Sequence, residues 1–367
     1  MSMHTRLFIP GPVDVAPDVL QKMATPQIGH RTKEASVLQK SIHDKMQKVL
    51  YTENTIMLST SSGSGFMEGS IRSCTRKRAA VFSIGAFGDR WYKMAVTNNV
   101  PADKFSPEPG QPTLPADVEK ALATGLYDVV TVTHNETSVG IQNPVEEIGE
   151  VIKAYNADKA EDEKVLYLVD AVSSAAGAKI EVDAIGIDCL ITSTQKSLGL
   201  PAGLAICSFS QRAYNAAKQV QFRGLYFDMV EIFDTIQKKN HQYPSTPSLA
   251  HMFALDYQLD RIMLEGIENR FARHTEMAQY VRAWARKHFG TLVKDDKYAS
   301  NTLTTILKPE GFDIKELNKR LAMRGYTISD GYGVMKDKTF RIAHMADATI
   351  ADIRGVLFEI EEILGLK

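Results

Sequence analysis

The chain has 367 residues, of which 44% are hydrophobic and 24% are charged, a composition typical of a globular protein with one large or two smaller domains. Its formal net charge of −1 gives no electrostatic reason to expect nucleic acid or a membrane surface as a partner. The N-terminal segment lacks the apolar core of a signal peptide, and no run approaches the ~18 apolar residues of a membrane span. Three cysteines without metal-binding spacing predict reduced thiols, so we expect a cytoplasmic protein with no structural metal.

The first two thirds of the chain alternate between short apolar runs and helical patterns. An irregular start, with two prolines and a glycine between Phe8 and Val13, precedes an amphipathic helix predicted over residues 34–51. The patterns then predict strands over 56–58, 79–84, 129–133, 165–169, 188–193 and 204–208, and helices over 66–74, 90–98, 115–124, 145–155 and 211–219. This alternation predicts a mostly parallel sheet covered by helices on both faces.

Two prolines within residues 241–247 interrupt the alternation, and a helix-rich region with a break near Gly266 follows. Here the patterns predict helices over 248–289, 313–324 and 349–364 and strands over 303–307 and 340–343. We therefore expect a large domain over residues 12–247 and a small C-terminal α+β domain over residues 248–367. The N-terminal segment, residues 1–11, is expected to belong to the small domain.

A carboxylate and an amine follow two neighbouring predicted strands. Asp170 ends the run at 165–169, and Lys196 follows the run at 188–193. Ligand chemistry in open α/β sheets collects at the carboxyl ends of strands. Pyridoxal phosphate (PLP) needs this pair, because a lysine forms its Schiff base and a carboxylate keeps its pyridine nitrogen protonated. Taken singly, such residues are more often a solvated surface lysine and a strand-end cap.

A loop rich in serine and glycine, residues 59–65, opens the helix predicted at 66–74. The N–H groups and the positive dipole end of such a helix favour a phosphate, although similar loops are often plain turns. Neither GxxxxGK[ST] nor GxGxxG is present, which argues against a P-loop or dinucleotide site. Phe87, between glycines at a strand end, could fill a turn or stack on a flat ring.

Taken in order, these segments resemble the class V aminotransferases of PLP fold type I, in particular the alanine–glyoxylate, serine–pyruvate and phosphoserine transaminases. The resemblance covers nearly the whole chain and is carried by residues 10–12, 62–65, 133–140, 169–174, 193–196 and 341–345. It implies PLP as the cofactor, bound by a large domain with a mostly parallel sheet beside a smaller α+β domain.

The resemblance also implies roles for individual residues. Lys196 would hold the cofactor as a Schiff base and then move a proton as general base and acid, while Asp170 would pair with the pyridine nitrogen. Phe87 would stack on the ring, where many relatives carry a larger aromatic residue, and Thr137 would bond its phenolic oxygen.

By the same resemblance, the cofactor phosphate would be bound by Ser64, Gly65, Phe66 and Gln195 of one subunit and by Tyr243 and Thr246 of the other. Many relatives have histidine in place of Phe66, a change that a backbone N–H donor tolerates. The shared site implies a homodimer.

Substrate binding is expected at a third group of residues. Arg341 matches the arginine that binds the substrate carboxylate, and Gly11 and Pro12 would line the mouth of the site. His30, Arg31, Arg223 and His344 could form a second anion site, or could equally make ordinary surface or intersubunit hydrogen bonds.

We therefore expect a transaminase that moves an amino group from alanine or serine to glyoxylate or pyruvate by ping-pong chemistry. Phosphoserine with 2-oxoglutarate is the alternative pair. A PLP lyase of the cysteine desulfurase type would need a mobile cysteine, and no cysteine lies in a suitable loop. A non-catalytic partner subunit would not need Asp170, Lys196 and Arg341 together.

Overall fold

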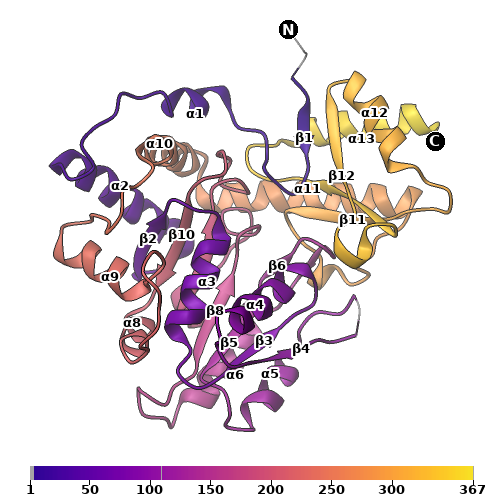
Figure 1. Cartoon of the computed structure of the whole chain (residues 1–367). Helices are drawn as coiled ribbons and strands as arrows, with labels where there is room; N and C mark the ends of the chain where they lie inside the picture. Colours follow the sequence, from indigo (N-terminus) through magenta and orange to yellow (C-terminus); the bar gives the residue numbers. More distant parts are fainter. Residues whose placement is uncertain (1–3, 109, 367) are drawn as a thin grey trace.

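A seven-stranded sheet forms the centre of the larger part of the molecule (Figure 1). The computed structural model describes residues 4–108 and 110–366. The strands run in the order β2 (Thr55–Ser59), β10 (Ala205–Phe209), β9 (Cys189–Ser193), β8 (Leu166–Asp170), β5 (Val129–Thr133), β3 (Ala79–Phe82) and β4 (Ala102–Phe105). β10 is antiparallel to both of its neighbours, and the remaining pairs are parallel. The predicted mostly parallel sheet is confirmed.

Helices cover both faces of this sheet. One face carries α1 (Pro17–Lys22), α2 (Lys33–Leu50), α5 (Pro115–Leu122), α6 (Val145–Asn156), α7 (Val182–Ile185) and α10 (Leu249–Glu265), and the other carries α3 (Gly63–Cys74), α4 (Ala86–Thr97), α8 (Gln211–Ala217) and α9 (Met229–Lys238). Side chains of a strand alternate between faces. In β8, Tyr167 and Val169 accordingly join one apolar core while Leu166 and Leu168 join the other, which explains its continuous apolar run.

The smaller part is a four-stranded sheet packed on helices at one end of the large sheet (Figure 1). Its strands run in the order β1 (Arg6–Phe8), β12 (Tyr326–Asp330), β13 (Thr339–Ala343) and β11 (Leu303–Leu307), and its helices are α11 (Ile267–His288), α12 (Ile314–Met323) and α13 (Ile350–Leu364). A short hairpin, β6 (Asn135–Glu136) and β7 (Ile141–Gln142), follows β5. No helix in the described part of the chain is long and apolar enough to span a membrane.

The helix-rich region after residue 247 divides between the two parts. Gly266, at φ +86°, ends α10, so the predicted break is confirmed. Leu255 and Leu259 of α10 pack in the core of the large sheet, whereas Met277 and Val281 of α11 pack on the small sheet. The expected domain boundary at residue 247 therefore lies one helix too early for the packing observed.

Several elements went unpredicted. The sequence patterns predicted no element at β1, α1, β4, α9 and β12. β1 forms only by pairing in parallel with β12, a long-range contact without a local signature. The helix predicted from residue 90 begins at Ala86, because Glu136 accepts hydrogen bonds from the N–H groups of Phe87 and Gly88 and so caps its first turn.

Candidate active site

The carboxyl ends of the central strands meet at a cavity of about 340 Å³. Asp170 is the last residue of β8, and Lys196 lies in the turn that follows β9. Five residues that the sequence singled out line this cavity together: Gly11, Phe87, Thr137, Lys196 and Arg341. The cavity therefore lies between the end of the large sheet and the small sheet, where residues far apart in sequence converge.

Asp170 is a buried carboxyl group without a cationic hydrogen-bond partner among the described residues. Its side chain accepts a 2.8 Å hydrogen bond from the Val172 N–H. Burial, with a smaller contribution from the nearby Glu136, raises its pKa from 3.8 to about 7, against the opposing effects of the Val172 N–H and of the charges on Arg90 and Lys196. A cationic ring N–H beside this carboxyl would supply the partner that the chain itself does not.

The Lys196 amine is held against the N-terminal segment and donates a hydrogen bond to the Pro10 carbonyl. Burial, followed by the positive charge of Arg341, lowers its pKa from 10.5 to about 8. Gly11 has φ +100°, and a Cβ there would lie 2.8 Å from the Gln195 carbonyl oxygen and 2.6 Å from the Lys196 Cδ, so glycine is required beside the lysine. A substantial fraction of the amine is therefore uncharged, and nucleophilic, just above neutral pH.

Arg341 points from β13 to the loop of the large part and links the two sheets. Its Nη1 donates to the Thr137 carbonyl at 3.1 Å, and its Nε and Nη2 donate to the Asp330 carbonyl at 2.9 Å and to the Ser329 hydroxyl at 3.0 Å. Burial lowers its pKa to about 10. These three bonds fix the plane of the guanidinium, as bidentate recognition of a carboxylate requires.

Phe87 lies in the first turn of α4, held by a carboxylate that the sequence analysis did not single out. Buried Glu136 accepts hydrogen bonds from the Phe87 N–H at 2.8 Å and the Gly88 N–H at 3.1 Å, and from the N–H and hydroxyl of Ser138 at 3.1 and 2.7 Å. The Phe87 ring is stacked on Tyr332, with centroids 6.0 Å apart. The backbone that carries the ring is thus fixed at the cavity wall.

The serine–glycine loop leads into α3, as predicted, with Gly63 as the first helical residue. The Gly65 N–H donates to the Ser62 carbonyl at 2.9 Å, and the Phe66 side chain is fully buried in the core. The Oε1 of Gln195 is buried and has no hydrogen-bond partner in the described part of the chain. The Ser64 hydroxyl accepts a 3.1 Å hydrogen bond from Arg90, a residue that the sequence analysis missed although it lies three positions after Phe87 on one helix face.

Other expected residues lie outside this cavity within a single chain. Tyr243 is buried beside Leu58 and Leu204, and Thr246 is exposed. The Gly11–Pro12 peptide is cis, and Val13 donates to the Gln195 carbonyl at 3.2 Å. Gly11 lines the cavity as expected, whereas Pro12 is not among its lining residues.

The four residues considered for a second anion site are engaged elsewhere or lie apart. His344 is fully buried, contacts Asn301 and Thr304, and has its pKa lowered to about 3 by burial, so it is not a cationic ligand. Arg223 pairs with Asp228 at 2.9 Å. Arg31 donates to the Tyr243 and Pro244 carbonyls, and His30 is half-buried. We therefore find no shared anion site for these four residues within one chain.

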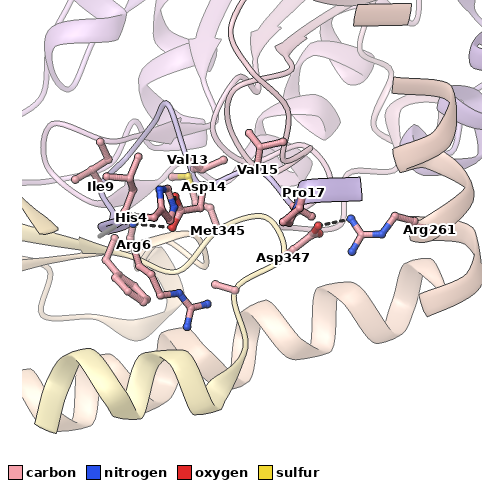
Figure 2. Close-up of a pocket in the computed structure, with 15 residues that line it drawn as sticks. His4, Arg6, Ile9, Val13, Asp14, Val15, Pro17, Arg261, Met345 and Asp347 are labelled. Atoms are coloured by element: carbon pink, nitrogen blue, oxygen red, sulfur yellow. Dashed lines mark hydrogen bonds and ion pairs between the residues drawn. The ribbon is translucent and has the colours of Figure 1, made fainter. Parts of the chain in front are cut away.

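A second, larger cavity of about 430 Å³ lies along the N-terminal segment and is also lined by Arg261, Met345 and Asp347 (Figure 2). Its polar side chains already have partners: His4 contacts Asp14 at 3.0 Å, Arg261 pairs with Asp347 at 2.6 Å, and Arg6 pairs with Asp352 at 2.5 Å. Ile9 lines both cavities. Because Lys196 and Arg341 line only the smaller cavity, that one is the candidate active site.

Comparison with known proteins identifies the family. A family model described as aminotransferase class V matches residues 22–354. The chain is 37% identical, over 98% of its length and 92% of the relative, to an uncharacterized aminotransferase of Methanocaldococcus jannaschii. It is 32% identical, over 96% of its length and 89% of the relative, to a serine–glyoxylate aminotransferase of Methylorubrum extorquens. An alanine–glyoxylate aminotransferase structure from Nostoc sp. aligns with a TM-score of 0.90 at 25% identity, covering 99% of this chain and 96% of that one.

The chain belongs to the class V aminotransferases and is a PLP-dependent enzyme that acts on amino acids and 2-oxo acids. The family, fold and cofactor expected from the sequence are confirmed. The site also fits PLP by its own chemistry. A buried carboxyl group has no cationic hydrogen-bond partner in the described part of the chain, a buried lysine has a lowered pKa, and the first residue of α3 contacts Val172, whose N–H binds that carboxyl group.

Proposed function

We propose that this enzyme moves the amino group of a small L-amino acid, alanine or serine, to glyoxylate or pyruvate by ping-pong chemistry. The observation that carries the proposal is the wall of the 340 Å³ cavity. Arg341 is the one arginine among its described lining residues, and Ile9, Pro10, Phe87 and Ile328 make much of the remainder apolar. Such a site suits a small substrate with a single carboxylate.

In this proposal the chain's own residues bind, orient and move protons. When bound, PLP supplies the electron sink that stabilises negative charge at the substrate Cα. Lys196 would hold the cofactor through its amine and, once released, would take a proton from the substrate Cα as a general base. A pKa of about 8 supports this role, because the amine then accepts and returns a proton near neutral pH.

The remaining residues of the proposed site orient the two ligands. Asp170 would pair with the pyridine nitrogen, which would restore the carboxylate charge that burial disfavours. Phe87 would stack on the ring, and Thr137 would bond its phenolic oxygen. Arg341 would bind the substrate carboxylate. The cofactor phosphate would lie at the start of α3, on Ser64, Gly65, Phe66 and Gln195, with Tyr243 and Thr246 reaching it from the second subunit.

A homodimer is part of the proposal, and exposed apolar side chains support it. Phe222 and Leu225 are each 87% exposed, and Tyr226 is 48% exposed. They precede Phe227, whose ring lies against Gly65 at the start of α3. A contiguous apolar surface beside a binding site commonly marks an interface. A second copy on this surface would bring the partner chain next to the proposed phosphate site.

The other functions considered are less well supported. Phosphoserine and 2-oxoglutarate carry a second anionic group. Of the residues that could have bound it, His344 is fully buried and Arg223 pairs with Asp228. Cys74, Cys189 and Cys207 are all buried, and burial raises the pKa of the Cys74 and Cys189 thiols, opposite to what a sulfur-transfer nucleophile needs.

The test is spectroscopic. The purified enzyme with PLP is expected to show a visible absorption band that alanine or serine bleaches and that glyoxylate or pyruvate restores. Phosphoserine is the comparison donor. Lys196→Ala is expected to abolish both the lysine-bound band and turnover. Bleaching by phosphoserine alone would contradict the substrate assignment, and turnover by Lys196→Ala would contradict the mechanism.

A further inference from the structure

Arg90 of α4 lies between two parts of the proposed cofactor site. Its Nη1 donates a 3.1 Å hydrogen bond to the Ser64 hydroxyl, and its Cζ lies 4.9 Å from the centroid of the Phe87 ring. We infer that Arg90 binds the phosphate of the cofactor, together with Ser64 and the N-terminus of α3. The inference deepens the proposed function and rests on it, since it requires the cofactor phosphate to lie at this helix.

The position of Arg90 follows from helix geometry. Residues three apart on an α-helix share a face, so Arg90 follows Phe87 on the side of α4 that approaches the cavity. Ser64 is the second residue of α3, close to the positive end of a helix of 12 residues. A guanidinium and a helix N-terminus thus converge on one hydroxyl group.

Arg90 lacks a counter-ion in the described part of the chain. No carboxylate there lies within ion-pair distance of its guanidinium, whereas Arg72, Arg76 and Arg78 pair with Glu68, Asp128 and Asp103. Arg90 is nevertheless only half-exposed. Its charge also lowers the pKa values of Asp170 and Lys196, so it acts within the site itself. An anion is the partner that this arrangement lacks.

The bond to Ser64 also orients the hydroxyl group for an anion. A serine hydroxyl has one proton to donate and two lone pairs to accept with. Because it accepts from Arg90, its own proton remains available to a phosphate oxygen. A phosphate at this point would receive charge-assisted hydrogen bonds from the guanidinium and a further bond from Ser64.

The test compares ligands that differ only in the phosphate. Pyridoxamine phosphate and pyridoxamine form no bond to Lys196, so their affinities for the cofactor-free protein report non-covalent contacts alone. We expect wild type to bind the phosphorylated ligand far more tightly, and Arg90→Gln to reduce that ratio tenfold or more, mainly by weakening pyridoxamine phosphate. Lys93→Gln, which removes an exposed cation from the same helix, is the matched control and should leave the ratio unchanged.

A second measurement uses the wild-type protein and so does not depend on the folding of a variant. Pyridoxamine phosphate should protect Arg90 from modification by phenylglyoxal, read by peptide mass spectrometry, and pyridoxamine should not. An unchanged ratio in Arg90→Gln, or absence of phosphate-dependent protection, would overturn the inference and leave the proposed function intact. Failure of wild type to bind pyridoxamine phosphate at all would overturn the proposed function and this inference together.

Discussion

Replacing Asp170 by asparagine should stabilise the cofactor-free protein. The pKa of an aspartate carboxyl is ordinarily 3.8, and that of Asp170 is about 7 in the folded chain, so folding favours its protonated form. The free energy of unfolding of wild type therefore falls as the pH rises from about 4 to about 7, and the loss stays constant above that. At about 1.4 kcal/mol per pKa unit, the loss is on the order of 4 kcal/mol at pH 8. Asparagine carries no charge to bury and retains an oxygen for the Val172 N–H.

The experiment is urea unfolding of the cofactor-free proteins from pH 5 to pH 8. Trp91 is buried in the core of the large sheet, so a Trp284→Phe background lets its fluorescence report that part of the molecule. We expect the stability advantage of Asp170→Asn to grow by roughly 2–3 kcal/mol over this range.

A matched control tests whether the expected stabilisation is specific to an unpaired buried carboxyl group. Asp188 is as buried as Asp170 but pairs with Arg212 at 2.7 Å, so Asp188→Asn should lose stability, by about 3–5 kcal/mol. A destabilised Asp170→Asn, or an advantage that does not change with pH, would refute the account of this site. The stabilised variant is also expected to lose turnover, because a neutral amide cannot hold the pyridine nitrogen protonated.

Three further predictions concern the other parts of the site. Arg341→Lys keeps the charge but loses the planar fork, so KM for the amino donor should rise about tenfold or more with an unchanged cofactor spectrum; an unaltered KM would contradict its substrate role. Glu136→Gln replaces one of two acceptor oxygens by an NH2 group, which must then face either the N–H groups of Phe87 and Gly88 or the N–H of Ser138. The variant should lower the free energy of unfolding by about 2 kcal/mol and weaken cofactor binding, measured by urea unfolding and by titration with PLP. Leu225→Asp, at an 87% exposed position, should leave the subunit folded but shift sedimentation toward monomers; a wild-type monomer would contradict the homodimer.

The elements that the sequence predicted well carry their own local signal. The strands at 129–133 and 303–307 coincide with β5 and β11, because continuous apolar or β-branched runs bounded by polar residues specify buried strands. The helix α9 was missed although Met229, Ile232, Phe233 and Ile236 recur at helical spacing. The apolar pattern of α9 is therefore present in the sequence. By contrast, β4 is a short edge strand with two charged residues, so its sequence has little apolar pattern.

Some residues of the candidate site can likewise be predicted from local sequence, and others cannot. Asp170 and Lys196 could be found from sequence because each follows a predictable strand and the carboxyl ends of neighbouring strands lie together. Glu136 and Arg90 could not be assigned roles so readily. Their contacts, to the start of α4 and to Ser64, join elements that only the tertiary structure brings together. Their roles, and those of the residues carried over from the family, stay predictions until the experiments above are done.

The site is also where the fold departs from what stability alone would favour. Asp170, Lys196 and Arg341 each have a pKa shifted toward the neutral form, and burial is the largest cause in every case. Elsewhere the chain pairs its buried charges, as Asp188 does with Arg212. A cofactor bonded to Lys196 and paired with Asp170, and a carboxylate on Arg341, would remove these three penalties at once. Tight ligand binding and the low stability of the cofactor-free protein then have one physical origin. A mutation that removes one of these buried charges should raise the stability of the cofactor-free protein and weaken ligand binding.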